Sequence, residues 1–433
     1  MVNEYVKPLA KTSTVKLVAI YLPQYHPIPE NDAAWGEGFT EWTNVKSATP
    51  LFEGHYQPHI PHEDIGYYDL RDPEVLVKQA AMANKYGIYG FAFYHYWFNG
   101  KLLLNTPLDN MLKLKKPDFP FLYIWANENW TRRWDGADNE IIVKQNYSLD
   151  DDYAHIRYLC ENVFCDARYI KIDNKPVFIV YRPELFPSIK KTAALWRKEI
   201  INYGYDGIYL INVNSLCHYP FTDPSNISFD AAMEFSPQFN PDIVKNIHSY
   251  QKNNKEMRYS RIDYENLLAA TLSYKVKFKR FRCITPAWDN AARKQKIGDS
   301  YMIKLPDCVV ELFSYWASRI IQETEQNFPK NEQFVFINAW NEWGEGCHIE
   351  PDKKYGYAFL EALQLSLCNY TQHPVPDAYI HSLENYNNSI IQKIEEIKKS
   401  FSYQIGKFVL TVPRMIKALV RRRNERKRNR CRA

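Results

Sequence analysis

The sequence lacks the features of several large protein classes. It contains no run of about 18 uncharged apolar residues, which argues against a transmembrane helix. Met1–Thr14 has no apolar core of a secretory signal, so we expect synthesis in the cytosol without export. The eight cysteines form no Cys-x-x-Cys pair, which disfavours a zinc knuckle or a disulfide scaffold. Phosphate-binding loops, dinucleotide-binding glycine turns and serine-hydrolase elbows are also missing.

The positive charge is concentrated at the C-terminal end. The chain carries +5 overall, but residues 414–433 contain ten Lys and Arg and one acid, Glu425, for a net +9. The other 413 residues therefore carry −4, which argues against nucleic acid as a partner of the body of the chain. With 45% hydrophobic and 24% charged residues, that body has the balance of an ordinary globular protein.

Short, continuously apolar segments recur along the chain. Such segments are typical of strands buried on both faces of a parallel sheet. They are residues 16–22, 88–94, 120–126, 176–181, 207–213, 229–235, 281–287 and 333–339. Helical patterns separate several of them; one begins at Asp72 and Pro73, a favourable cap and first residue, and ends before Gly87. Eight strands alternating with helices predict an α/β fold, the (β/α)₈ TIM barrel.

The chain is expected to divide into three parts. Residues 1–14 form an N-terminal arm, 15–370 the catalytic barrel, and 371–433 a helical extension that ends in the basic tail. Residues 236–280 are too many for one connection, so we expect an inserted excursion between strands six and seven. Residues 214–228 look too few for a good helix.

Polar and aromatic clusters follow the first, second, third, seventh and eighth predicted strands. In barrels of this kind the active site lies at the C-terminal ends of the strands. Buried carboxylates and imidazoles must be paired, so five such clusters are hard to explain as core alone. The substrate-binding candidates are Gln24, Tyr25, His26, Glu41, Trp42, His95, Tyr96, Trp97, Asn127, Glu128, Asn129, Trp130, Arg132, Trp288, Asp289, Trp340, Asn341, Trp343, His348 and Glu350.

Glu342 and Glu345 are the expected catalytic residues. Glycoside chemistry needs one protonated and one ionised carboxyl, and two acids three residues apart at a strand-to-loop junction can face one pocket. Repulsion between them beside aromatic neighbours would raise one pKa and leave the other acid ionised. A salt-bridged or capping pair on a surface loop is the alternative; the flanking tryptophans and glycines favour function. Glu128 is a rival partner for Glu342 in an ordinary acid/nucleophile dyad, although we favour a sugar-hydroxyl ligand there.

No metal site or cofactor is expected. His55, His59 and His62 lie in one proline-rich loop, which argues against the helix that would align such ligands. The three aspartates at residues 150–152 fit the Asp-x-Asp pattern of metal-dependent nucleotide-sugar enzymes. They more naturally open a helix, where acids favour the N-terminal dipole.

Six long blocks follow one another in order along the chain: Ala19–His26, Trp35–Trp42, Gly54–Pro73, Tyr86–Trp97, Leu122–Trp134 and Phe336–Pro351. Together they resemble the WbsX-type proteins of bacterial surface-polysaccharide clusters. Those proteins are described as glycosyltransferase-like and as related to family 99 glycoside hydrolases. The resemblance covers about residues 15–370 and does not include the tail from about residue 385.

This resemblance implies a metal-independent barrel enzyme that retains anomeric configuration. In family 99, which cleaves within α-mannosyl chains, the sugar's own 2-hydroxyl attacks the anomeric carbon and forms a 1,2-anhydro intermediate. One Glu deprotonates that hydroxyl, and a second Glu three residues later acts as acid and then base. The resemblance places these roles on Glu342 and Glu345. Gly344 stands where the hydrolases typically carry a larger residue.

The expected function is glycosidic-bond chemistry in the assembly of lipopolysaccharide O-antigen or capsule. The substrate is expected to be an oligosaccharide or a lipid-linked glycan in the cytosol. A nucleotide-sugar-dependent glycosyltransferase and a non-catalytic glycan-binding barrel remain alternatives. A short basic helix after Pro413 could contact the inner face of the cytoplasmic membrane, and a solvated tail is the alternative.

Overall fold

The computed structural model describes residues 13–132, 137–215, 223–237, 246–252, 255–294 and 300–369, with scattered positions from 376 to 399. The chain divides into two units, Met1–Pro376 and Asp377–Ala433, and the first contains the fold discussed below. Most of the predicted arm and the whole basic tail lie outside the described residues.

Eight parallel strands close into a barrel, which confirms the predicted fold. In barrel order they are β1 (Lys16–Tyr21), β2 (Ile88–Phe98), β4 (Phe121–Trp125), β8 (Lys175–Val180), β9 (Tyr209–Asn214), β10 (Ala231–Glu234), β13 (Arg280–Ile284) and β15 (Phe334–Ile337). Each strand pairs in parallel with the next, and β15 pairs with β1 to close the ring. Each of the eight predicted segments overlaps one of these strands, because strands covered on both sides are apolar throughout.

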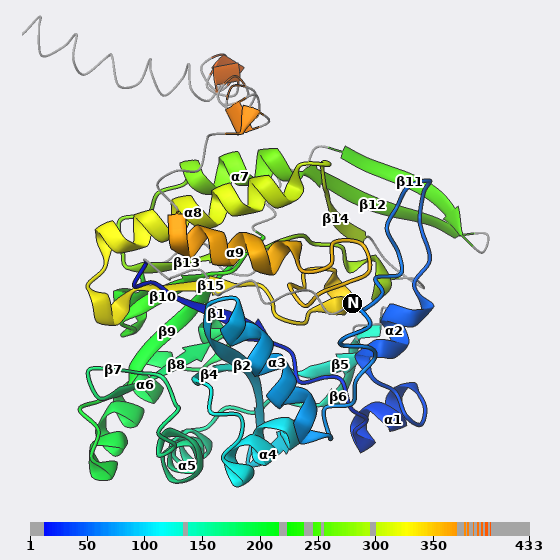
Figure 1. Cartoon of the computed structure of the whole chain (residues 1–433). Coiled ribbons are helices and arrows are strands. Elements are labelled where there is room, and N and C mark those ends of the chain that lie inside the picture. The colour runs from blue at the N-terminus through cyan, green and yellow to red at the C-terminus, as the bar shows by residue number, and fades with distance from the viewer. Residues whose placement is uncertain are drawn as a thin grey trace, which may run out of the picture. The chain divides into compact units, whose positions relative to one another are not determined.

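Helices cover the outside of the barrel (Figure 1). They are α3 (Pro73–Lys85), α4 (Thr106–Leu114), α5 (Leu149–Leu159), α6 (Ile189–Glu199), α7 (Tyr264–Ser273), α8 (Val309–Asn327) and α9 (Ala358–Asn369). The start of α3 follows the prediction, since the Asp72 side chain accepts a hydrogen bond from the backbone N–H of Glu74. Between β9 and β10 the described residues hold a 3₁₀ turn, Pro224–Ile227, and no α-helix.

The predicted excursion between strands six and seven is present. It contains the antiparallel pair β11 (Asn246–Lys252) and β12 (Lys255–Asp263), followed by α7. A strand from the next connection, β14 (Ser300–Lys304), pairs in parallel with β12, so two connections build one small sheet. The sequence did not predict this sheet, because its pairing joins segments on either side of a barrel strand.

Further short elements gather at the same end of the barrel as this sheet, at the right of Figure 1. After β1 come α1 (Pro29–Trp35) and α2 (Glu41–Ser47), and after β4 comes the hairpin of β5 (Trp130–Arg132) and β6 (Ala137–Val143). Of two further small strands, β3 (Lys101–Leu103) pairs with the end of β2, whereas β7 (Lys171–Ile172) pairs with the start of β8, at the opposite end of the barrel. Apart from β7, these added elements are concentrated at one end.

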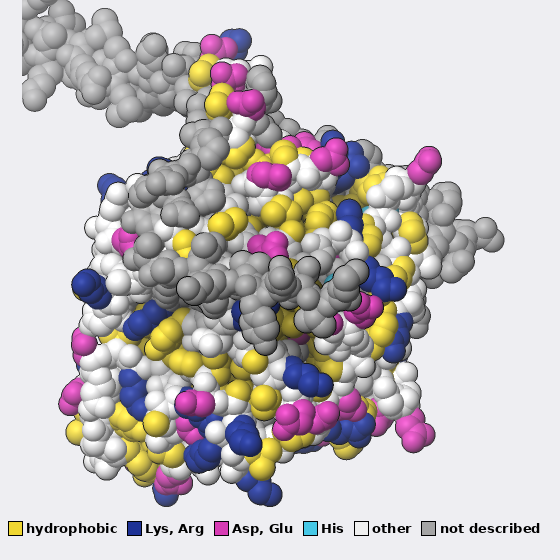
Figure 2. All heavy atoms as spheres, viewed as in Figure 1, with side chains coloured by type: hydrophobic (Ala, Val, Ile, Leu, Met, Phe, Trp, Pro, Cys, Tyr) yellow, Lys and Arg dark blue, Asp and Glu magenta, His cyan; other side chains and the backbone are white. Residues whose placement is uncertain are grey.

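The surface of the described unit shows no single sign of charge on the face in Figure 2. There, lysine and arginine side chains are interspersed with aspartate and glutamate side chains. None of the described helices is long and apolar enough to cross a membrane.

A buried ion network ties the sixth and seventh strands to the outer helices. The Arg282 Nε atom lies 2.7 Å from Oε2 of Glu234, and its Nη1 atom lies 2.7 Å from Oε1 of Glu323 on α8. Its Nη2 atom donates to the carbonyl of Thr271 on α7 at 3.0 Å. Because Glu234 and Arg282 are both buried, each charge depends on the other for compensation.

Glu234→Ala should therefore destabilise the protein by about 3–5 kcal/mol, because it leaves Arg282 buried without its partner on β10. The measurement is the free energy of unfolding in urea. Glu361→Ala, which changes an exposed acid on α9, serves as the control and should stay within about 0.5 kcal/mol of the wild type. A loss below about 1 kcal/mol in Glu234→Ala would contradict the compensating role of this pair.

Candidate active site

A cavity of about 340 Å³ opens at the C-terminal end of the barrel. Every barrel strand contributes to it through its end or the loop that follows. The lining residues are Leu22, Gln24, Tyr94, Tyr96, Ala126, Glu128, Asn129, Trp130, Thr131, Tyr181, Ser215, Phe235, Pro237, Trp288, Asn290, Arg293, Lys294, Glu342 and Glu345. The position is the one that active sites occupy in this fold.

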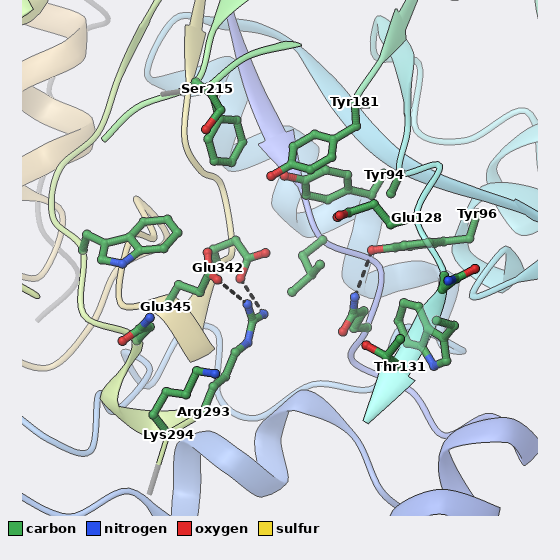
Figure 3. Close-up of a pocket in the computed structure, with 18 of the residues that line it drawn as sticks. Tyr94, Tyr96, Glu128, Thr131, Tyr181, Ser215, Arg293, Lys294, Glu342 and Glu345 are labelled. Carbon is green, nitrogen blue, oxygen red and sulfur yellow. Dashed lines mark hydrogen bonds and ion pairs between the residues drawn. The ribbon is translucent and has the colours of Figure 1, made fainter. Parts of the chain in front are cut away.

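One guanidinium contacts three carboxylates at this cavity. The Nη2 atom of Arg293 lies 2.8 Å from Oε2 of Glu342, and its Nη1 atom lies 2.7 Å from Oε1 of Glu345 (Figure 3). Its Nε atom donates to Oε1 of Glu41 at 2.9 Å. The three acids come from the loop after β15 and from the start of α2, so Arg293 joins distant parts of the chain.

Burial raises the pKa of Glu342 well above its usual range. Arg293 opposes this effect, while the negative charges of Glu345 and Glu41 add to it. A carboxyl with a raised pKa is a stronger base once it is ionised, and it can also hold a proton near neutral pH. The pair Glu342 and Glu345 thus combines a buried, tuned acid with a second acid on the same wall.

The turn that carries the two acids has a specific local cause. Residues Trp343–Glu345 form a single 3₁₀ turn, which ends at Gly346 with φ of 60°. Gly344 is needed for a different reason: a Cβ atom there would lie 1.9 Å from Oε1 of Glu41. The absence of a side chain at residue 344 therefore leaves room for a third carboxylate behind the pair.

Aromatic rings and a fourth acid form the rest of the cavity. Figure 3 places Glu128 near Tyr94 and Tyr96, across the cavity from Glu345. The Glu128 carboxylate is paired with the guanidinium of Arg182. Tyrosine and tryptophan rings present flat apolar faces with polar edges, which suit the faces of sugar rings.

The structure brings eight of the candidates predicted from sequence to this cavity. They are Gln24, Tyr96, Glu128, Asn129, Trp130, Trp288, Glu342 and Glu345. The amide of Gln24 donates to the hydroxyl of Tyr96 at 2.9 Å. These residues are brought together from the ends of strands one, two, three, seven and eight, as the clusters indicated.

Several other candidates hold the loop after β15 and do not line the cavity. Glu350 accepts hydrogen bonds from Tyr68, Gln79, Trp340 and Trp343 at 2.6–2.9 Å. Burial raises its pKa to about 7, although all four donors favour the ionised form. The side chain of Asn341 bonds to both backbone groups of Leu22, and the Tyr25 hydroxyl donates to the carbonyl of Asn341.

A second group of candidates supports neighbouring loops. Glu41 is fully buried behind the acid pair, and Trp42 beside it packs against Tyr25. Asp289 lies 2.7 Å from Nε2 of His55, and its backbone N–H donates to the carbonyl of Glu345. The side chain of Asn127 donates to the carbonyl of Arg182 at 2.8 Å.

Other candidates lie away from the cavity lining. His95 lies 2.9 Å from His155 on α5, and the indole of Trp97 donates to Asp151 at the start of that helix. Both side chains point outward because side chains alternate along a strand, and it is Tyr94 and Tyr96 that reach the cavity. His26 is buried, and burial lowers its pKa to about 4. Arg132 lies 3.3 Å from Glu140 of the β5–β6 hairpin.

One cluster of metal-ligating atoms occurs within the described residues. His59, His348 and Asp352 bring their ligand atoms within 4.8 Å of one another. The Nδ1 atom of His59 lies 2.9 Å from Nε2 of His348, a hydrogen-bond distance that explains the contact without an ion. The other two histidines of the proline-rich loop have different partners: His55 contacts Asp289, and His62 lies beside Asp64.

The aspartates at residues 150–152 open α5, as the helix-start interpretation predicts. The Asp151 side chain accepts from Trp97, and the Asp152 side chain accepts from the Thr192 hydroxyl at 2.6 Å. None of the three lines the cavity.

Arg293 is the most important residue that the sequence interpretation missed. Tyr94, Tyr181, Ser215, Phe235 and Lys294 also line the cavity and were not predicted. A signal for Arg293 did exist: buried acids require a counter-charge, and this arginine follows Trp288 and Asp289 in the loop after strand seven. The spacing alone, however, does not show which cation of which loop supplies the charge.

A closed (β/α)₈ barrel with a carboxylate pair in an aromatic cavity at its C-terminal end defines a class of carbohydrate-active proteins. Residues 17–363 match the family described as Glycosyltransferase WbsX, and the chain belongs to that family. This result confirms the family resemblance seen in the sequence.

Two curated relatives share the family's sequence over most of this chain. Both are described as "Uncharacterized protein WxcX", from two strains of Xanthomonas campestris pv. campestris. They are 39% identical over 373 and 361 residues, which is 83% of this chain in each case. The chain spans about half the length of these relatives.

Solved structures show a similar fold. A "Glycoside hydrolase-like protein" aligns with a TM-score of 0.53 at 13% identity, over 84% of this chain and 97% of that protein. A GH99 endo-alpha-mannosidase from Bacteroides thetaiotaomicron aligns with a TM-score of 0.47 at 13% identity, over 87% of this chain and 98% of that one. The first of these alignments confirms the fold.

The raised pKa of Glu350 predicts how stability depends on pH. Its folded-state pKa of about 7 exceeds the value of about 4.3 that is usual for an unfolded chain. Its stabilising contribution is therefore fully present below about pH 4.3 and is lost as the pH rises through about 7. The amide in Glu350→Gln does not titrate, and its NH₂ group would face the donors that Glu350 accepts from. The variant should therefore be less stable than the wild type at about pH 5, and the difference in stability should narrow by about pH 8.

The measurement for Glu350 is the midpoint of thermal unfolding for both proteins across this range. Glu37→Gln, a substitution of an exposed acid, is the matched control, and the difference between its unfolding midpoint and that of the wild type should stay the same across this pH range. A constant gap between Glu350→Gln and the wild type would show that Glu350 does not titrate there.

Proposed function

We propose that this chain acts on a glycosidic bond with retention of configuration, through Glu342 and Glu345. The observation that carries the proposal is the pairing of both acids with one guanidinium, Arg293, in a cavity lined by aromatic rings. This arrangement can hold one acid protonated and the other ionised, which is the division of labour that glycoside chemistry needs.

The proposed reaction has two steps. First, Glu342 accepts the proton of the substrate's 2-hydroxyl as that oxygen bonds to the anomeric carbon. Glu345 donates its proton to the leaving oxygen, the glycosidic bond breaks, and a 1,2-anhydro sugar results. Second, Glu345 deprotonates water or an acceptor hydroxyl, which attacks the anomeric carbon, while Glu342 returns its proton to the 2-oxygen. Water gives hydrolysis, and a sugar hydroxyl gives transfer.

Contact with Arg293 favours the ionised form of Glu342 that the first step requires, and once Glu342 is ionised its raised pKa makes it a stronger base toward a sugar hydroxyl proton. Glu128 suits a ligand for sugar hydroxyls, since it lies across the cavity and is already paired with Arg182. The aspartates at residues 150–152 support α5, which disfavours a metal-dependent nucleotide-sugar mechanism built on them. We propose that the reaction needs no metal.

The proposed substrate is an oligosaccharide or lipid-linked precursor of O-antigen or capsule. Membership of the WbsX family and the sequence resemblance to surface-polysaccharide proteins support this choice. The direct test is to incubate the protein with free and lipid-linked glycans of its own strain, with and without nucleotide sugars, and to identify products by mass. Products that require a nucleotide sugar would favour the glycosyltransferase alternative.

Glu342→Gln and Glu345→Gln should each lower kcat by about 10²–10⁴-fold, because each removes general acid–base assistance while preserving shape. Glu128→Gln should mainly raise KM, because Glu128 is proposed as a ligand for sugar hydroxyls. All three are assayed on the same glycan, in the presence and absence of a chelator, which should not change the rates.

Comparable activity in a folded Glu342 or Glu345 variant would remove that residue from the mechanism. Complete loss in Glu128→Gln, restored by azide as an external nucleophile, would favour the ordinary covalent route through Glu128. Loss of wild-type activity in chelator, restored by manganese or magnesium, would overturn metal independence.

We further propose that the chain works in the cytosol at the inner face of the membrane, where its basic end contacts anionic lipid. The ten Lys and Arg of residues 414–433 support this, at about 1 kcal/mol for each cation near an anionic surface. Sedimentation with anionic vesicles should pellet the full chain and not a chain stopped after Ser400, and salt should weaken the binding. Equal pelleting of both chains, or of neither, would contradict the proposal.

A further inference from the structure

We propose that Glu41 is a positioning residue, which orients the Arg293 guanidinium toward Glu342 and Glu345 and sets the charge balance of that pair. This inference rests on the proposed function of the pair and extends it to a third carboxylate. Glu41 lies far from both acids in sequence, and none of its atoms is needed to line the cavity.

The geometry of Arg293 makes the orientation depend on Glu41. A guanidinium is planar, so contacts on two of its nitrogens leave rotation about the line that joins them, whereas contacts on all three fix the direction of every N–H group. The Nε atom of Arg293 lies 2.9 Å from the Glu41 carboxylate. Its Nη2 atom lies 2.8 Å from Glu342, and its Nη1 atom lies 2.7 Å from Glu345. Without Glu41, the plane could rotate about the remaining contacts, and the two acids would lose their fixed separation.

Glu41 itself is held by the loops around it. It is the first residue of α2 (Glu41–Ser47), its side chain is fully buried, and its backbone N–H donates to the carbonyl of Gln24 at 3.2 Å. A buried carboxylate is costly unless it is paired, and Arg293 supplies that pairing. Arg293 and Glu41 are thus a buried pair directly behind the acids.

Gly344 provides the independent observation. A Cβ atom at residue 344 would lie 1.9 Å from Oε1 of Glu41 and 2.9 Å from Nε of Arg293. The φ angle of Gly344 is outside the left-handed region, so glycine is required there for space and not for backbone conformation. The turn between the catalytic acids is therefore shaped to admit Glu41.

The charge balance follows from these contacts. Three carboxylates share one guanidinium, so the group carries an excess of negative charge that favours retention of a proton on the pair. The other titratable or charged groups that face Glu342 are Tyr25 from the loop after β1, Tyr94 and Tyr96 from β2, Cys347 from its own loop, and Lys294 at the cavity wall. Among the acids, Glu41 is the one that contributes charge without access to substrate.

The first test is Glu41→Gln, which removes the charge and keeps an oxygen that can accept from Nε of Arg293. Removing a like charge favours ionised carboxylates, so both limbs of the pH profile of kcat should move to lower pH, by about 0.5–1 unit. A purely structural role would lower the maximum without moving the limbs. Glu37→Gln, the same change at an exposed position of the same segment, is the control and should leave the profile in place.

A substrate-independent readout keeps this inference separate from the proposed reaction. With ¹³C-labelled glutamate carboxyl groups, the resonance that disappears in Glu342→Gln identifies Glu342, and its titration is followed in the full chain. Glu41→Gln should shift that titration to lower pH even if no glycan is turned over. An unmoved titration would overturn the inference, and a shifted titration in an inactive protein would overturn only the proposed reaction.

The second test is a double-mutant cycle between Glu41 and Gly344. Gly344→Ala should lower kcat at least about 10-fold with little change in KM, because its methyl group displaces Glu41 from Arg293. In a Glu41→Ala background, the carboxylate that the methyl group would displace is absent and Arg293 is no longer held at Nε, so adding Gly344→Ala should cost less than about 2-fold. Additive losses in the cycle, measured on kcat and on the thermal unfolding midpoint, would show that residue 344 does not act through Glu41.

Discussion

The contact between Arg293 and its three carboxylates is the interaction on which the rest of the cavity depends. Glu342 and Glu41 are buried, and burial of two such acids beside Glu345 would be strongly unfavourable without a cation. Arg293 supplies the cation from the loop after β13, while the acids come from the loops after β1 and β15. The guanidinium therefore joins three loops, and it does so where the chemistry is proposed to occur.

Around this contact, a set of hydrogen bonds fixes the loop after β15. Glu350 gathers the donors of Tyr68, Gln79, Trp340 and Trp343, and Asn341 binds both backbone groups of Leu22. Of these residues, Leu22 lines the cavity and the others do not. Their effect is to hold Glu342 and Glu345 on a turn that has little freedom, which an acid pair needs for a defined geometry.

The barrel was predictable from sequence because continuous apolar runs distinguish strands covered on both sides from other segments. The position of the candidate cavity agrees with the same pattern, since the polar clusters stand at strand ends. What the sequence could not give was the direction of each side chain: in the run from Tyr94 to Trp97, alternate residues face the cavity and α5. Contacts between distant loops, such as those of Glu41 and Arg293, also leave no local pattern.

The small sheet outside the barrel has a consequence for the evolution of this site. The loop that carries Arg293 begins at Trp288 and Asp289 and is tied to β14: the N–H of Ile303 donates to the carbonyl of Trp288, and Tyr301 donates to the side chain of Asn290. Since β14 pairs with β12 of the excursion, the arginine is anchored to the part of the chain that least resembles a barrel. A change in the length of that excursion would therefore act on the position of this cation without any substitution among the acids.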